Sequence, residues 1–167
     1  KLKITDSKIE SNRLLLLKAL YPELTILNLS NSDDSQVMKK ALENSSSTVI
    51  DIHHAGTAMR FLTAFFATQE NRKVILTGSP RMQERPIQIL VDALRDLGAD
   101  IRYLKDEGYP PLKIIGKNLE KSKVELAASV SSQYISALLL IAPRLKSGLQ
   151  LKLKGKITSV PYIRMTI

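Results

Sequence analysis

Apolar residues recur along the chain with two different spacings. Gaps of three and four residues predict helices that bury one face, whereas alternation of apolar and polar residues predicts half-buried strands. The predicted helices cover residues 11–20, 32–42, 58–67, 86–97 and 131–142, and residues 159–167 have the pattern of a helix start. The predicted strands cover residues 24–29, 47–52, 72–77, 100–104, 111–115, 123–127 and 149–154.

Local signals set the expected ends of these elements. Ser11 and Ser32 are placed to cap the first two helices, and Pro22 stops the first. Pro86 suits the first position of the fourth helix, and Gly98 suits its end. The stripe that this helix is expected to bury consists of Ile87, Leu90, Val91, Leu94 and Leu97.

The order of the elements indicates an α/β or α+β fold with mixed connections. Helices and strands do not alternate strictly, so repeated smaller α/β units are favoured over a doubly wound parallel sheet. A weak internal repeat supports such units, because polar caps precede apolar helices at Arg13, Arg60 and Tyr134. The length of 167 residues fits one domain.

Composition excludes several classes of protein. The chain has no cysteine, which excludes a disulfide scaffold, an iron–sulfur cluster, a cysteine zinc site and a cysteine nucleophile. A cysteine-free chain fits the cytoplasm. No apolar run approaches the roughly 20 residues of a membrane span, so no membrane partner is expected.

The formal net charge of +9 changes the picture, because it indicates an anionic partner. The basic residues are dispersed, aromatic residues make up only 5% of the chain, and tryptophan is absent. Nucleic-acid binders usually cluster their basic residues and add aromatics for stacking. Small anionic substrates are therefore favoured over nucleic acid.

Candidate chemistry lies at four predicted helix starts that combine small or hydroxyl residues with a nearby basic residue. They are residues 7–13, 55–60, 129–133 and 159–162. Helix N-termini offer unpaired N–H groups to phosphates and carboxylates, and arginine adds a two-pronged donor. In the simpler interpretation the serines only cap helices, and Arg13 and Arg60 are solvated or paired with acids. His53 and His54 are adjacent on the chain, so they are not expected to share a metal ion.

Five ordered motifs closely resemble the N-terminal half of the 3-phosphoshikimate 1-carboxyvinyltransferase (EPSP synthase) family. They lie in residues 7–13, 55–62, 76–87, 131–139 and 159–162. The resemblance implies one domain, residues 1–167, of a two-domain enolpyruvyl transferase built from repeated βαβαββ units. It implies transfer of the enolpyruvyl group of phosphoenolpyruvate to the 5-hydroxyl of shikimate 3-phosphate, with release of phosphate and without cofactor or metal.

The resemblance also assigns expected roles to individual residues. The residues expected to contact shikimate 3-phosphate are Lys8, Arg13, Ser131, Ser132, Gln133, Ser159 and Tyr162. The residues expected to contact phosphoenolpyruvate are Lys8, Gly56, Arg85 and Gln133. A lysine between two anions should stay protonated, so Lys8 is also the candidate proton donor.

The chain departs from the family pattern at some positions and in length. Ile9 replaces a usual serine, so Ser7 or Ser11 would have to supply that hydroxyl, and His54 replaces a usual asparagine. The family enzyme is about twice as long, and its second domain supplies acidic groups. The chain alone is therefore expected to be inactive. Two alternatives stay open: the related UDP-N-acetylglucosamine enolpyruvyl transferase and a noncatalytic RNA-binding repeat module.

Overall fold

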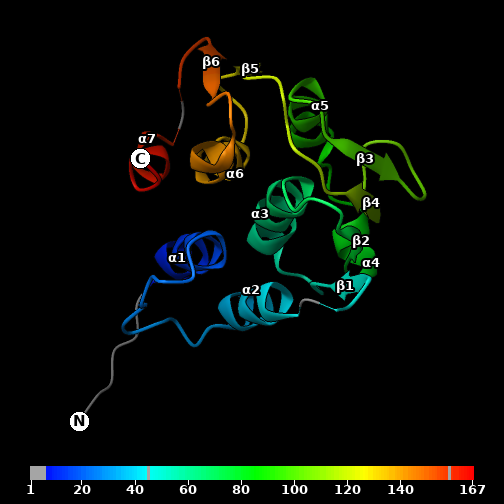
Figure 1. Cartoon of the computed structure of the whole chain (residues 1–167), viewed down its shortest axis with the longest axis vertical. Coiled ribbons are helices and arrows are strands. Elements are labelled where there is room, and N and C mark those ends of the chain that lie inside the picture. The colour runs from blue at the N-terminus through cyan, green and yellow to red at the C-terminus, as the bar shows by residue number, and fades with distance from the viewer. Residues whose placement is uncertain (1–6, 45, 158) are drawn as a thin grey trace.

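The computed structural model describes residues 7–44, 46–157 and 159–167 (Figure 1). The helices are α1 (Lys8–Leu20), α2 (Asp33–Glu43), α3 (Gly56–Ala67), α4 (Pro80–Gln83), α5 (Gln88–Asp96), α6 (Ser132–Ile141) and α7 (Val160–Arg164), with a 3-10 turn at Ala142–Arg144. The strands are β1 (Val49–Asp51), β2 (Lys73–Thr77), β3 (Asp100–Tyr103), β4 (Leu112–Ile115), β5 (Lys123–Ala127) and β6 (Gln150–Lys154).

The strands form two separate sheets. The larger has the order β1-β2-β4-β3, with β1 parallel to β2 and both other pairs antiparallel. The smaller is the parallel pair β5 and β6. Helix α3 makes the crossover between β1 and β2, as parallel strands require. This mixed arrangement confirms the α/β class and the absence of a doubly wound sheet among the described residues.

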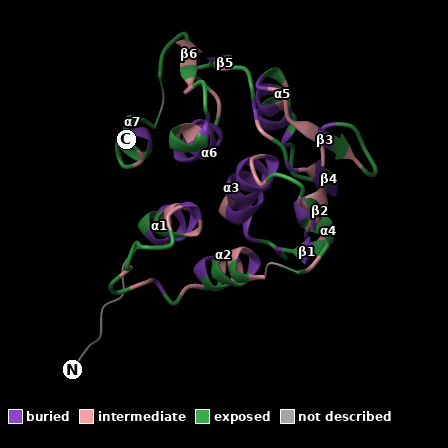
Figure 2. Cartoon of the chain, in the orientation of Figure 1, coloured by how far each residue is buried: buried purple, intermediate pink, exposed green. Residues whose placement is uncertain are grey.

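Helix α3 is the centre of the core. Every one of its residues except Thr57 is buried, and Phe61, Leu62 and Phe66 have no exposed surface. A helix that is apolar on all sides must be covered on all sides. Figure 1 shows α1, α2 and α6 around α3 with the larger sheet beyond it, and Figure 2 shows α3 almost entirely in the colour of buried residues.

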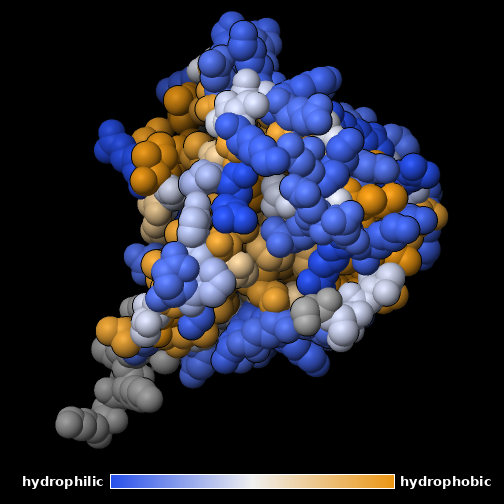
Figure 3. Space-filling view, in the orientation of Figure 1, coloured by the Kyte–Doolittle hydropathy of each residue, from blue (hydrophilic) through white to orange (hydrophobic). Residues whose placement is uncertain are grey.

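The surface is mostly hydrophilic in the view of Figure 3, and apolar residues gather around α7. The exposed apolar residues of that region include Val160, Met165 and Ile167. Among the described residues, no helix is both long enough and apolar enough to cross a membrane.

The start of the first helix differs from its prediction. Helix α1 begins at Lys8, and Ser7 rather than Ser11 caps it by accepting the N–H of Ile9. Ser11 lies inside the helix with no exposed surface, and its Oγ accepts the N–H of Ser30 at 2.9 Å. A serine at a helix start and a serine that braces a distant loop look alike in the sequence.

Residues 24–29 do not form the predicted strand. They pair with no other strand among the described residues, and the side chain of Leu27 is 79% exposed. Alternation of apolar and polar residues is compatible with one buried side, but a strand also needs a neighbouring strand edge to satisfy its N–H and C=O groups. The prediction of this strand is wrong for that reason.

The segment before α5 is the third difference. The prediction placed Pro86 at the first helical position, whereas α5 begins at Gln88 and Pro80 opens the short helix α4. The rest of that prediction is confirmed: the five residues of the apolar stripe are all fully buried, and Gly98 ends the segment with a φ of +108°. The added turn of α4 brings Arg85 towards the start of α3.

Candidate anion-binding site

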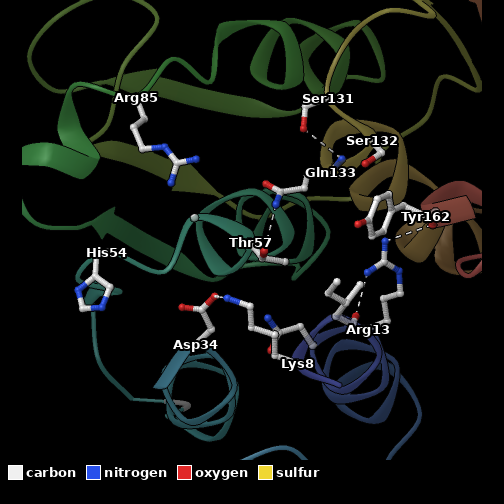
Figure 4. A pocket seen from close by; sticks show the side chains of 13 residues that line it. Lys8, Arg13, Asp34, His54, Thr57, Arg85, Ser131, Ser132, Gln133 and Tyr162 are labelled. Carbon is white, nitrogen blue, oxygen red and sulfur yellow. Dashed lines mark hydrogen bonds and ion pairs between the residues drawn. The ribbon is translucent and has the colours of Figure 1, made fainter. Parts of the chain in front are cut away.

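A cavity of about 530 Å³ lies at the N-terminal end of α3 (Figure 4). Its walls come from α1, α2, the turn after β1, α3, the turn after α4, the start of α6, and α7. The lining residues are Lys8, Ile9, Asn12, Arg13, Asp34, His54, Gly56, Thr57, Arg85, Ser131, Ser132, Gln133 and Tyr162. All substrate residues predicted from the sequence are among them except Ser159, which stands before α7 with a φ of +56°.

Lys8 and Asp34 form an ion pair on one wall of the cavity. Lys8 Nζ lies 3.1 Å from Asp34 Oδ2, and the two side chains are 57% and 18% exposed. The pair joins the first turn of α1 to the first turn of α2, and Figure 4 shows both groups below Thr57. Because Lys8 has a long flexible side chain, a partner on a different helix restricts where its ammonium can lie.

Gly56 and Arg85 are in direct contact at the start of α3. A Cβ at position 56 would lie 3.1 Å from Arg85 Cζ and 3.3 Å from Nη2, so only glycine lets the guanidinium rest there. Arg85 is exposed, and among the described residues no carboxylate pairs with it. This guanidinium and the unpaired N–H groups of the first turn of α3 are together suited to bind a phosphate or carboxylate.

Arg60 holds this part of the site together from beneath. It is only 5% exposed, and its guanidinium donates to the carbonyl oxygens of Gly56 and Pro86, each at 3.1 Å. Burial lowers its pKa, Tyr134 opposes this lowering in part, and the positive charge of Arg85 adds a smaller lowering. Arg60 is therefore buried, and no acid among the described residues pairs with it. The simpler interpretation, which expected a solvated or acid-paired side chain, is wrong for this residue.

The start of α6 forms another wall of the cavity, with Ser131, Ser132 and Gln133. Ser131 caps α6 and accepts the backbone N–H of Gln133 at 3.3 Å, which confirms the predicted start of that helix. Gln133 Nε2 donates to Thr57 Oγ1 at 3.1 Å, so the starts of α6 and α3 are joined directly. The two helix N-termini therefore meet at one cavity, as Figure 4 shows.

Arg13 is more deeply built into the fold than its predicted role requires. It is 6% exposed, and its guanidinium donates to Ile9 O, Ser136 Oγ, Thr166 Oγ1 and Tyr162 O at 2.8–3.3 Å. Burial lowers its pKa, and its charge also lies 5.5 Å from the centre of the Phe61 ring. Arg13 thus binds α1 to α6 and α7 while it lines the cavity.

Several lining residues were not in the predicted set. Asn12 follows Lys8 by four positions, so the helical spacing could have placed it on the same face. Asp34 reaches the cavity from the first turn of α2, where an acid also stabilises the N-terminus of its own helix. Ser7 and Ser11, the proposed substitutes for the hydroxyl missing at Ile9, are engaged in backbone contacts and do not line this cavity.

The charges of the site favour anions. Its lining carries three permanent cations, Lys8, Arg13 and Arg85, and one carboxylate, Asp34. The described part of the chain contains no group of three or more His, Asp or Glu residues arranged to hold a metal ion. The fold and the site therefore define a mixed α/β domain with two helix N-termini and several cations at one cavity, an arrangement suited to a small anionic ligand.

Comparison with known proteins gives the family. A sequence profile of EPSP synthase (3-phosphoshikimate 1-carboxyvinyltransferase) matches residues 39–167. Proteins named 3-phosphoshikimate 1-carboxyvinyltransferase from Bacteroides fragilis and Haemophilus influenzae are 54% and 41% identical to the chain over 99% and 98% of its length. The chain belongs to the EPSP synthase family, as the five ordered motifs predicted.

A solved EPSP synthase from Acinetobacter baumannii has the same fold. It superposes with a TM-score of 0.78 over 98% of the chain, at 16% sequence identity. The chain covers 42% of that structure and 40% and 44% of the Bacteroides and Haemophilus proteins. It thus spans about two fifths of the length of the relatives that it matches.

Proposed function

We propose that the chain binds shikimate 3-phosphate and phosphoenolpyruvate as one domain, residues 1–167, of an EPSP synthase. In that enzyme the enolpyruvyl group passes to the 5-hydroxyl of shikimate 3-phosphate and phosphate is released. The observation that carries the proposal is the convergence of Lys8, Gly56, Arg85 and the Ser131–Gln133 segment on one cavity. The cysteine-free composition supports a cytoplasmic location as part of the same proposal.

The two walls of the cavity suit the two substrates. Arg85, Gly56 and the first turn of α3 form an anion site for phosphoenolpyruvate, while Ser131 and Ser132 offer hydroxyls to the phosphate of shikimate 3-phosphate. Gln133 is hydrogen-bonded to Thr57 and so joins these two walls. Such a division holds the two reactants side by side, which lowers the entropy cost of their reaction.

Lys8 lines the same cavity as both proposed sites and carries a proton that it can donate. A protonated ammonium there reduces the repulsion between two bound anions and strengthens as a hydrogen-bond donor once water is excluded. Addition of a hydroxyl to the enolpyruvyl double bond needs a proton donor and a proton acceptor. We assign the donor to Lys8 and the acceptor to acidic groups of the second domain, so the chain alone should not turn over.

Binding experiments with crossed variants test this proposal. NMR titration of the chain should show weak binding of each substrate, with shifts at residues that line the cavity. Arg85→Ala should weaken the binding of phosphoenolpyruvate more than that of shikimate 3-phosphate, and Ser132→Ala should have the opposite effect. Each variant is therefore the control of the other. The absence of binding at millimolar ligand would contradict the proposal.

A kinetic assay tests the expectation that the chain alone does not turn over. The purified chain, given both substrates, should release no phosphate above the rate of a blank. Measurable steady-state release would show that the acidic groups assigned to another domain are not needed.

A further inference from the structure

His54 lines the main cavity and two further cavities beside it. One of these, of about 560 Å³, is lined by His54, Arg81, Met82 and Arg85. The other, of about 250 Å³, brings His54 together with Asp33, Asp34 and His53. Figure 4 shows the ring of His54 on the same side of the main cavity as Arg85, away from Ser132 and Tyr162.

The turn between β1 and α3 fixes the position of His54. Asp51 Oδ1 accepts the N–H of His53 at 2.7 Å, and His53 adopts a φ of +50°. The carbonyl oxygen of His53 accepts the N–H of Ser79 at 2.9 Å, and Ala55 donates to Ile52 O at 3.0 Å. His54 is thus held between two anchored residues, two positions before Gly56.

Charged groups surround His54 from four elements. Helix α2 contributes Asp33 and Asp34, α4 contributes Arg81 and the following turn Arg85, and α1 contributes Lys8. Its own segment contributes Asp51 and His53, which lie 3.7 Å apart. Within the main cavity as described, His54 is the one side chain of a type that ordinarily changes its charge between pH 5 and pH 8.

We propose that His54 is a further anion-binding residue, whose protonation adds a positive charge to the Arg85 side of the cavity. Anion affinity then rises as the pH falls through the titration of its imidazole. The identity of the anion as phosphoenolpyruvate rests on the function proposed above, whereas the charge effect applies to any anion bound beside Arg85. At a separation of about 6 Å in a solvated site, one added charge changes the affinity for a dianion by about fivefold.

The test uses two ligands and two matched variants. His54→Asn keeps a polar side chain and removes the titrating charge, and His53→Asn makes the same change at the neighbouring exposed position outside the main cavity. Dissociation constants for sulfate and for phosphoenolpyruvate are measured by NMR from pH 5.5 to pH 8. At each pH the dissociation constant of the variant is divided by that of the unmodified protein, so that the titration of the ligand itself cancels.

The expected ratio for His54→Asn rises as the pH is lowered from 8 to 5.5, by up to about fivefold with either ligand. His53→Asn should leave the ratio near 1 throughout. A flat ratio for His54→Asn with sulfate would overturn the inference. If sulfate shows the expected profile and phosphoenolpyruvate does not bind, the charge effect stands and the proposed function fails.

A second measurement needs no variant of the protein. The chain contains two histidines, so their ring signals can be followed separately through a pH titration. Because coupling between two bound species is reciprocal, saturating sulfate should move the His54 titration to higher pH by about 0.7 of a unit. The His53 titration serves as the internal control. Equal movement of both signals, or of neither, would also overturn the inference.

Discussion

Gly56 lies beneath the guanidinium of Arg85, so a methyl group added at this position tests whether that contact is needed for anion binding. The backbone of Gly56 is outside the positive-φ region, so alanine fits its conformation. Gly56→Ala should therefore leave the free energy of unfolding unchanged or raise it by up to about 1 kcal/mol. Any loss of binding then cannot be ascribed to misfolding.

The expected loss of affinity follows from the geometry. The new Cβ would lie 3.1 Å from Arg85 Cζ, closer than a carbon atom normally packs, so the flexible guanidinium must move away from the start of α3. A hydrogen bond to a charged group contributes about 1.5–3 kcal/mol. Losing this contact should lower the affinity for phosphoenolpyruvate by about 10-fold to 100-fold, at roughly 1.4 kcal/mol for each factor of ten.

A double-mutant cycle separates displacement of Arg85 from direct obstruction by the methyl group. Calorimetric or NMR titration with phosphoenolpyruvate is carried out on Gly56→Ala, Arg85→Met and the double variant, and urea unfolding checks their stability. If the methyl group acts through Arg85, Gly56→Ala should have little further effect in the Arg85→Met background. Equal losses in both backgrounds, or unchanged binding in the single variant, would refute this explanation.

Three further predictions concern residues around the core and the site. Arg13→Met leaves several acceptors without their donor, so urea unfolding should show a loss of about 1–3 kcal/mol; an unchanged midpoint would contradict it. The buried hydroxyl of Tyr103 has no partner among the described residues, and burial raises its pKa to about 12. The unfolded chain therefore loses this proton at lower pH, so stability should fall more steeply between pH 10 and 12 than in Tyr103→Phe; parallel curves would count against this. Asp34→Ala should increase the mobility of the Lys8 side chain in NMR spectra, whereas Asp33→Ala should not. Equal effects of the two variants would contradict a specific role of Asp34 in holding Lys8.

Elements whose burial is decided locally were predictable. The stripe from Ile87 to Leu97 repeats at helical spacing and is fully buried, and the cap at Ser131 begins α6 as expected. In both cases the pattern and the turn chemistry of the same segment indicate the same structure. The short helix α4 was missed because it spans only four residues, too few for periodicity to show.

Elements that depend on distant parts of the chain were not predictable in the same way. Residues 24–29 have the alternation of a strand, but pairing depends on whether another strand edge lies beside them. Ser11 looks like a cap, but its hydroxyl is used by Ser30, 19 positions further on. No local pattern records either partner.

The candidate site shows the same division. The motif residues Lys8, Gly56 and Arg85 were found because the family resemblance extends along the chain, and the cavity brings them together. Asp34 was not among the predicted site residues, because an acid in a first turn already has a sufficient local explanation. That it faces Lys8 follows from the packing of α1 against α2, which a helix-by-helix analysis does not contain.

The net charge of +9 indicated an anionic ligand, but much of the positive charge near the site has another task. The guanidinium groups of Arg13 and Arg60 are buried against hydroxyl and carbonyl oxygens, where they join helices to one another. Lys8 and Arg85 remain exposed at the cavity, whose lining also includes the starts of α3 and α6. The proposed selectivity for anions therefore depends on where a few donors point, and a protein of much lower net charge could achieve it with the same arrangement.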